Sequence, residues 1–245
     1  MEKIIFSLIF FNLVGCSYFS HSSDENIVKN ECKVAGEDST QCKIKNLKDY
    51  TSIEKEASLG ILYLFGDNKT QANYKLAYKF LRSAADNNNV EALNGLGIIY
   101  LYGMGKNQDY DVAEKYFKTA LNLGDKIAEY NLGELYRQKD NIDLSAYWYQ
   151  KAIVDNPYKA YEGLSKLYIQ NNEYKKAFIY SEKAAELNNP EAEYNLGVFF
   201  EKGIYVEMDI NKAIYWYQKA AQKGHHDAIN NLQGINNGTV ANSDK

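Results

Sequence analysis

The chain has 245 residues, of which 45% are hydrophobic and 24% are charged, and its formal net charge is −4 at pH 7. Wholesale disorder is excluded, because disordered chains are poor in the apolar side chains that build a core. The acidic balance argues against a broad nucleic-acid surface, which needs a basic stripe. The 22 tyrosines are large and amphipathic, and they predict extended packing or binding surfaces.

The N-terminus carries the pattern of a secretion signal. An apolar run from Ile4 to Val14 follows Met1, Glu2 and Lys3. As a helix this run would rise about 16 Å, against roughly 30 Å of bilayer hydrocarbon. It is therefore too short to span a membrane, and it fits the apolar part of a signal peptide over residues 1–15.

The end of this run resembles the lipobox of bacterial lipoproteins. Two aliphatic residues, a small residue and a cysteine stand in sequence at Leu13-Val14-Gly15-Cys16. The resemblance implies cleavage before Cys16 and lipidation of that cysteine. Ser17 in place of an aspartate implies delivery to the outer membrane, facing the periplasm. An ordinary signal peptide that happens to contain a cysteine is the alternative.

Residues 16–46 are predicted to be a flexible tether between the lipid anchor and a folded domain. They are rich in Ser, Asp, Glu, Lys and Asn and lack helical periodicity. With Cys16 lipidated, Cys32 and Cys42 remain as an even pair, and an oxidising envelope favours a disulfide between them. Two free thiols are the alternative, and two cysteines are too few for a structural zinc site.

From residue 47 onwards the chain repeats one helix pattern. Leucines recur at steps of 32 to 37 residues, at Leu59, Leu96, Leu132, Leu164, Leu196 and Leu232. Each of the first five precedes a Gly or Ser, and a Tyr or Phe stands four residues after it. This spacing places Leu and the aromatic residue on one helix face, and the small residue between them permits close approach of another helix.

A second helix is predicted after each of these five. Its buried face begins at a small residue, with an aromatic residue three positions later and Ala seven positions later. The five small residues are Ala77, Ala113, Ser145, Ala177 and Ala213. The aromatic position holds Trp148 in one repeat and Trp216 in another, so we expect both tryptophans in the core.

Glycine and asparagine mark the expected turns. The position eleven residues after each small residue is always Gly or Asn, which predicts left-handed caps at Asn88, Gly124, Asn156, Asn188 and Gly224. Inside the longer repeats, Gly66, Gly103 and Gly203 predict loops that need a freely rotating φ. The shorter repeats have Lys139 and Asn171 there, so we expect tight turns without such a residue.

These segments resemble Sel1-like repeats, which are relatives of the tetratricopeptide repeat. The resemblance is carried by stretches such as Ala92-Leu93-Asn94-Gly95-Leu96-Gly97 and Gly103-Met104-Gly105. It implies an all-α fold, a right-handed solenoid of five helix pairs over residues 47–235. A C-terminal capping helix should start near residue 225 and end at Gly234, and residues 236–245 are expected to be a disordered tail.

No catalytic or cofactor-binding motif stands out. The chain has no GxSxG, no HExxH and no Walker loop, so we expect neither an enzyme nor a cofactor nor a metal. Adjacent residues diverge by about 100° on a helix, which makes His225 and His226 a poor metal site. Both histidines are therefore predicted to be solvated.

A protein-binding groove is expected along the first helices. In a tetratricopeptide-type stack, the positions two before, two after and five after each leucine point into a concave groove. The predicted binding residues are Asn94, Ile98, Leu101, Tyr130, Glu134, Arg137, Glu162, Lys166, Tyr194, Val198 and Glu201. Tyr and Arg are typical interface anchors. Alternatively, the tether covers the apolar end at Ile61, Leu64, Ile98 and Leu101.

The sequence thus predicts a monomeric, lipid-anchored scaffold of the bacterial envelope that binds another protein and no nucleic acid. Resemblance to envelope Sel1-like proteins implies a narrower hypothesis, an immunity protein that neutralises a secreted toxin or lipase effector. A different hypothesis is an adaptor or virulence factor that organises envelope or host partners. A hydrolase would need a catalytic motif that is not seen here.

Overall fold

The computed structural model describes residues 50–67 and 71–236. The predicted signal peptide, Cys16, the predicted tether with Cys32 and Cys42, and residues 237–245 lie outside the described residues. The expectations for these segments therefore stay predictions.

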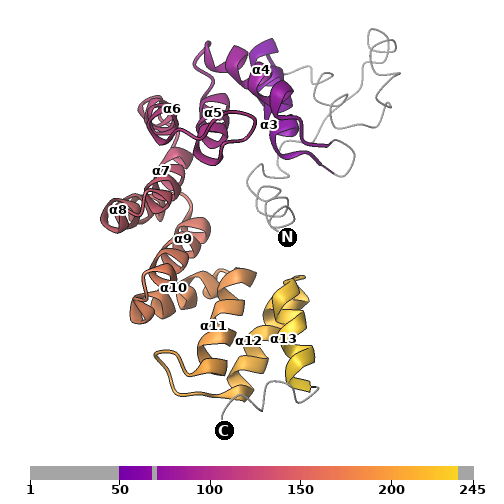
Figure 1. Cartoon of the computed structure of the whole chain (residues 1–245), viewed down its shortest axis with the longest axis vertical. Coiled ribbons are helices and arrows are strands. Elements are labelled where there is room, and N and C mark those ends of the chain that lie inside the picture. Colours follow the sequence, from indigo (N-terminus) through magenta and orange to yellow (C-terminus); the bar gives the residue numbers. More distant parts are fainter. Residues whose placement is uncertain (1–49, 68–70, 237–245) are drawn as a thin grey trace. The chain divides into compact units, whose positions relative to one another are not determined.

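The described ranges form eleven α-helices and no strand (Figure 1). The helices are α3 (Ser52–Phe65), α4 (Tyr74–Ala85), α5 (Val90–Tyr102), α6 (Tyr110–Asn122), α7 (Ile127–Gln138), α8 (Ile142–Ala152), α9 (Pro157–Gln170), α10 (Tyr174–Glu186), α11 (Pro190–Lys202), α12 (Ile210–Gln222) and α13 (His226–Asn236). The predicted all-α fold of helix pairs is confirmed. The chain divides into two compact units, an N-terminal unit of Met1–Ala128 and a C-terminal unit of Glu129–Lys245.

The helices begin where short polar side chains cap them. The first residue outside the helix accepts a backbone N–H bond through its side chain at Asn73, Asn89, Asp109, Asn141, Asn156, Asn189 and Asp209. Thr51 and Glu54 form a reciprocal capping box at the start of α3. None of the described helices is both long and apolar enough to cross a membrane.

Four of the five predicted left-handed caps are confirmed. Asn88, Gly124, Asn188 and Gly224 have φ values of 59°, 95°, 62° and 83°. Asn156 was predicted wrongly, because its φ is −141° and its side chain caps the start of α9 instead. Pro157 opens α9, and a residue before proline is driven to extended backbone.

The loops within the repeats also need left-handed residues. Gly66, Gly103 and Gly203 have φ values of 72°, 68° and 62°, as predicted for the long loops. The expectation that the two tight turns need no such residue is wrong. Asp140 and Asn172 adopt φ values of 54° and 57°, one position after Lys139 and Asn171. Asp and Asn tolerate this conformation better than other side chains with a Cβ atom.

Close helix approach at the small residue after each leucine is confirmed. A Cβ atom built on Gly97 would lie 2.3 Å from Cε1 of Phe117 on α6, and one on Gly133 would lie 2.5 Å from Cδ1 of Tyr149 on α8. Gly60 meets Leu81 and Gly197 meets Tyr217 in the same way. The fourth repeat replaces this contact with two small residues, because the Ser165 and Ser181 hydroxyls lie 2.7 Å apart.

The partner of each glycine is not the aromatic residue that the sequence pattern singled out. The fully buried side chains stand four residues after the small residue of each second helix, at Leu81, Phe117, Tyr149, Ser181 and Tyr217. At about 100° per residue, the third and fourth positions lie equally far from the face shared by the small residue and the seventh, so helix periodicity alone does not choose between them. Trp148 and Trp216, at the third position, are only half-buried, and Trp216 packs against the edge of a buried cluster rather than inside it.

The capping helix continues beyond its predicted end. α13 runs to Asn236 and includes Gly234. Glycine inside a helix costs about 1 kcal/mol relative to alanine. Leu232 and Ile235 offset that cost by packing against a buried cluster that contains Ala213, Tyr217, Ala220 and Ala228.

Replacing Gly97 with leucine should lower the free energy of unfolding by about 1–3 kcal/mol or more, because the new side chain would overlap the Phe117 ring. Urea unfolding followed by circular dichroism measures this. Lys115→Ala on the exposed side of α6 is the matched control, and it should change stability by less than about 0.5 kcal/mol. Equal midpoints for the two variants would place Gly97 away from the helix contact.

Candidate protein-binding surface

The N-terminal unit buries the binding residues predicted within it. Asn94, Ile98 and Leu101 on α5 retain 7%, 5% and 1% of their exposure. The Asn94 side chain donates to the Val90 carbonyl and to the Asp125 carboxylate. Because α3 packs against α5 in this unit, these side chains offer no exposed surface. A role for the tether in covering them lies outside the described residues.

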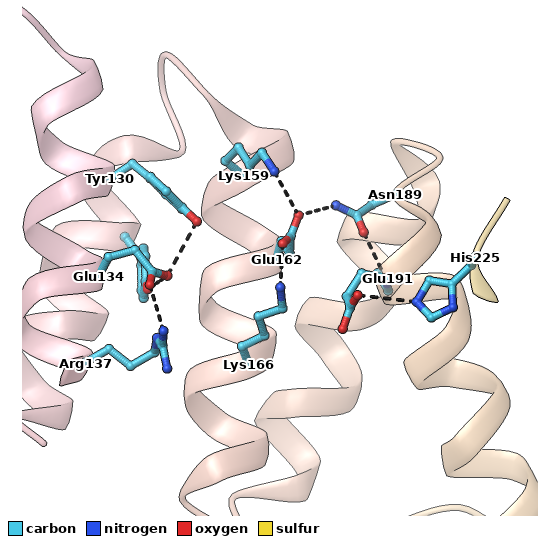
Figure 2. Close-up of polar contacts among 11 residues, drawn as sticks. Tyr130, Glu134, Arg137, Lys159, Glu162, Lys166, Asn189, Glu191 and His225 are labelled. Carbon is cyan, nitrogen blue, oxygen red and sulfur yellow. Dashed lines mark hydrogen bonds and ion pairs between the residues drawn. The ribbon is translucent and has the colours of Figure 1, made fainter. Parts of the chain in front are cut away.

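The C-terminal unit brings the other predicted residues together on its first helices. On α7, Glu134 accepts a bond from Arg137 Nη2 at 2.7 Å, and the Tyr130 hydroxyl lies 3.4 Å from its Oε1 (Figure 2). The hydroxyl of buried Tyr149 on α8 also donates to Glu134. Arg137 Nη1 donates to Gln170 Oε1 at 3.0 Å, which joins α7 to α9.

Glu162 on α9 is the centre of a second cluster. Its Oε1 accepts from Lys166 Nζ at 2.7 Å, and its Oε2 lies 3.5 Å from Lys159 Nζ. The side-chain amide of Asn189, just before α11, donates to the same Oε2 at 2.8 Å (Figure 2). Lys159 and Asn189 were not predicted from the sequence.

A third cluster joins α11 to the start of α13. His225 Nε2 lies 3.3 Å from Glu191 Oε2, and the His225 ring stacks on Tyr194 with centroids 4.6 Å apart. The prediction that His225 is merely solvated is therefore wrong, whereas His226 is exposed. His225 stands just before α13 and about one repeat step after Tyr194, so no local sequence pattern signals this contact.

The remaining predicted residues of α11 face α12. Glu201 accepts a hydrogen bond from the Tyr217 hydroxyl, which repeats the pairing of Glu134 with Tyr149. Val198 is half-buried against the cluster around Tyr217. A further buried carboxylate that the sequence did not indicate, Glu193, lies against Lys223 and, at 3.6 Å, Lys219.

Neighbouring cations and hydrogen-bond donors keep Glu162, Glu134 and Glu191 charged. Burial alone would raise the pKa of Glu162, but Lys166, Lys159 and the amide of Asn189 outweigh it and lower that pKa. Burial would also raise the pKa of Glu134, but Arg137 and the hydrogen bond from Tyr149 outweigh burial and lower that pKa. The hydrogen bond from His225 lowers the pKa of Glu191. Glu162, Glu134 and Glu191 are therefore ionised at neutral pH, and each is held by a cation or a donor.

These paired charges form a rigid surface, which suits the recognition of another molecule without rearrangement. Among the described residues no group of His, Cys, Asp and Glu is placed to hold a metal ion. A polar hollow beside Arg137 and Gln170 has a volume of about 290 Å³, at the lower limit of small-molecule pockets. The ion pairs instead hold half-buried Tyr130, Lys166 and Tyr194 in place, and such preorganised side chains lower the entropic cost of binding.

Comparisons with known proteins agree with the repeat pattern. The Sel1 repeat model matches residues 56–89, 90–125, 126–153, 160–189 and 190–225. The structure of a Sel1 repeat protein from Oxalobacter formigenes is similar, with a TM-score of 0.59, 24% identity, and coverage of 81% of this chain and 79% of that one. Immunity protein Pa5087 from Pseudomonas aeruginosa has a TM-score of 0.51 and 19% identity, over 73% and 69% of the two chains.

Curated relatives match over shorter stretches. Activator of C kinase protein 1 from Saccharomyces cerevisiae is 32% identical over 107 residues, which are 38% of this chain and 17% of that protein. The first curated relatives are much longer proteins, and this chain spans between 9% and 21% of their length.

Replacing Glu162 with glutamine should lower the free energy of unfolding by roughly 3–5 kcal/mol, because Lys159 would stay buried without its counter-charge. The exposed pair of Lys176 and Glu173 provides the control, and Glu173→Gln should cost less than about 1 kcal/mol. Urea unfolding of both variants measures the difference.

The same variants test the pH dependence. A carboxylate whose pKa is lowered on folding contributes stability above its unfolded value, and this contribution is lost as the pH falls through the folded value. The native chain should therefore lose stability as the pH falls below 4.5, the ordinary glutamate value, and Glu162→Gln should lose less of it. Parallel pH profiles for the two proteins would contradict a structural role for the ionised Glu162.

Proposed function

Because the chain belongs to the Sel1 repeat family, whose helix pairs form scaffolds, we propose that it binds another protein through the first-helix face of its C-terminal unit. This face is defined by Tyr130, Glu134 and Arg137 on α7, Glu162 and Lys166 on α9, and Tyr194, Val198 and Glu201 on α11. The observation that carries the proposal is the pair of equivalent, half-buried tyrosines that the ion-pair clusters hold in place.

Tyr130 and Tyr194 share one environment in the third and fifth repeats. The Tyr130 ring lies 5.6 Å from that of Tyr149, and the Tyr194 ring lies 5.7 Å from that of Tyr217. Both tyrosines are half-buried. Rigid tyrosines beside paired charges are the side chains that most often anchor protein interfaces. Binding is favoured over catalysis, because the charged groups of this face are paired with one another.

The proposed location is the bacterial envelope, with a lipid anchor at Cys16 in the outer membrane and the repeats in the periplasm. Support comes from the apolar run and from Leu13-Val14-Gly15-Cys16. A narrower proposal for the partner is a secreted toxin or lipase effector, a class suggested by the fold shared with an immunity protein. A toxin encoded next to this chain would favour it over an envelope or host adaptor role.

Tyr130→Ala and Tyr194→Ala should each weaken binding of the true partner by about 1–3 kcal/mol, as loss of an interface aromatic does. Titration calorimetry with the purified partner measures this, after circular dichroism has shown that each variant is folded. Lys115→Ala on the N-terminal unit serves as the control and should leave the affinity unchanged. Full affinity in the double tyrosine variant would place the binding surface elsewhere.

Cys16→Ser should abolish metabolic labelling with a fatty acid and release the protein from the membrane fraction, because the thiol that carries the lipid would be absent. Cys32→Ser is the matched control and should leave labelling unchanged. If Cys16→Ser still labels and still fractionates with membranes, the chain is not a lipoprotein.

A further inference from the structure

The second helices of the C-terminal unit expose apolar side chains at one repeated position. This outer position stands two residues after the small residue of each second helix. It is Tyr147 on α8, Ile179 on α10 and Tyr215 on α12, with exposed fractions of 48%, 38% and 53%. In the N-terminal unit the same position is lysine, at Lys79 and Lys115. The fold therefore accepts a charged residue there, and packing does not require the apolar ones.

Lysine follows each of these apolar residues one helical turn later. Lys151, Lys183 and Lys219 stand at i+4 from Tyr147, Ile179 and Tyr215, on the same helix faces. The equivalent residues of the N-terminal unit are uncharged, Ser83 and Thr119. The two units thus differ at both positions, and the difference holds in all three successive repeats of the C-terminal unit.

These lysines carry charge that the protein itself only partly neutralises. Lys151 and Lys183 form no ion pair with any described residue, and their ammonium groups lie 5.7 Å from the Tyr147 ring and 5.5 Å from the Tyr180 ring. Lys219 lies 4.9 Å from the Trp216 ring and 3.6 Å from the Glu193 carboxylate. The position just before each of these lysines holds Gln150, Glu182 or Gln218, so lysines outnumber carboxylates along this surface.

Aromatic neighbours widen the apolar surface. The half-buried Trp148 ring meets Tyr147 edge-on at 5.2 Å, and Trp216 meets Tyr215 at 5.1 Å. A single exposed apolar side chain is ordinary on a protein surface. An apolar residue at the same position in three successive repeats is different, because recurrent apolar exposure rimmed by polar groups marks interaction sites.

We propose that this outer stripe, made of Tyr147, Ile179 and Tyr215 with Lys151, Lys183 and Lys219, docks an amphipathic acidic segment of a protein partner. Apolar side chains of that segment lie on the tyrosines and the isoleucine. Its carboxylates pair with the lysines, and the positive charge of the stripe selects an acidic over a basic segment. The outer stripe lies on the second helices and is a different surface from the first-helix face.

The probes are three fluorescein-labelled helical peptides of about four turns each. The first has an apolar face flanked by glutamates, the second replaces the glutamates with lysines, and the third replaces the apolar residues with serines. Fluorescence anisotropy titrations should show that the acidic amphipathic peptide binds at least about tenfold more tightly than the other two. Its affinity should fall as salt is added, because exposed charge pairs are screened.

The matched variants install the residues that the N-terminal unit already carries. The triple variant Tyr147→Lys, Ile179→Lys and Tyr215→Lys should weaken binding of the acidic peptide by about tenfold or more, as loss of a central apolar contact does. The triple variant Lys151→Ser, Lys183→Ser and Lys219→Ser should weaken binding and remove most of its salt dependence. Tyr174→Lys, an exposed tyrosine of α10 outside the stripe, should leave binding unchanged. Urea unfolding shows whether each variant keeps its fold.

Several results would overturn the proposal. Equal binding of the acidic and basic peptides, or unchanged binding in the triple lysine variant, removes its basis. Binding to vesicles that contain phosphatidylglycerol but to none of the peptides would make the stripe a lipid surface. Self-association in sedimentation velocity that the triple lysine variant abolishes would make it a contact between two copies. Tyr194→Ala should not affect peptide binding, so failure of the outer stripe is distinguishable from failure of the first-helix face.

Discussion

Close contact between a small residue on each first helix and a buried side chain on the following helix is the constraint on which the repeats depend. The rings of Phe117, Tyr149 and Tyr217 occupy the space that a Cβ atom on Gly97, Gly133 or Gly197 would fill. Interiors are packed densely enough that a single added carbon forces a shift there. The pairing therefore sets the distance between the two helices of each repeat, and with it the positions of all side chains on both outer faces.

Buried ion pairs then determine what the first helices of the C-terminal unit present to solvent. Glu162 joins Lys159 and Lys166 on its own helix to Asn189 at the start of the next repeat. Taking such charges out of water is costly, so each needs its partners in fixed geometry. The fixed geometry of these pairs immobilises the polar side chains around Tyr194. A surface preorganised in this way loses little side-chain entropy when a partner binds.

The two faces of the C-terminal unit follow different physical rules. On the first-helix face, Glu134 and Glu162 are buried and paired with neighbouring cations, so the proposed recognition depends on the geometry of the tyrosines between them. On the second helices, Tyr147 and Lys151 are exposed, and the lysine has only an aromatic ring nearby. Under the two proposals together, the scaffold would hold two protein segments at once, one by shape and one by apolar contact and charge.

Periodicity by itself determined the helix pairs, the small residues at which helices approach closely and the long loops, because these depend on residues near one another in sequence. The side chain that meets each glycine was not determined in this way. The leucine of each repeat and the glycine after it, such as Leu96 and Gly97, needed no tertiary information. Which side chains form the ion-pair clusters was decided only by the stacking of one repeat on the next. Glu162 meets Asn189 across 27 residues, and Glu191 meets His225 across 34. No local pattern specifies such contacts, because the rotation between successive helix pairs sets which positions face each other.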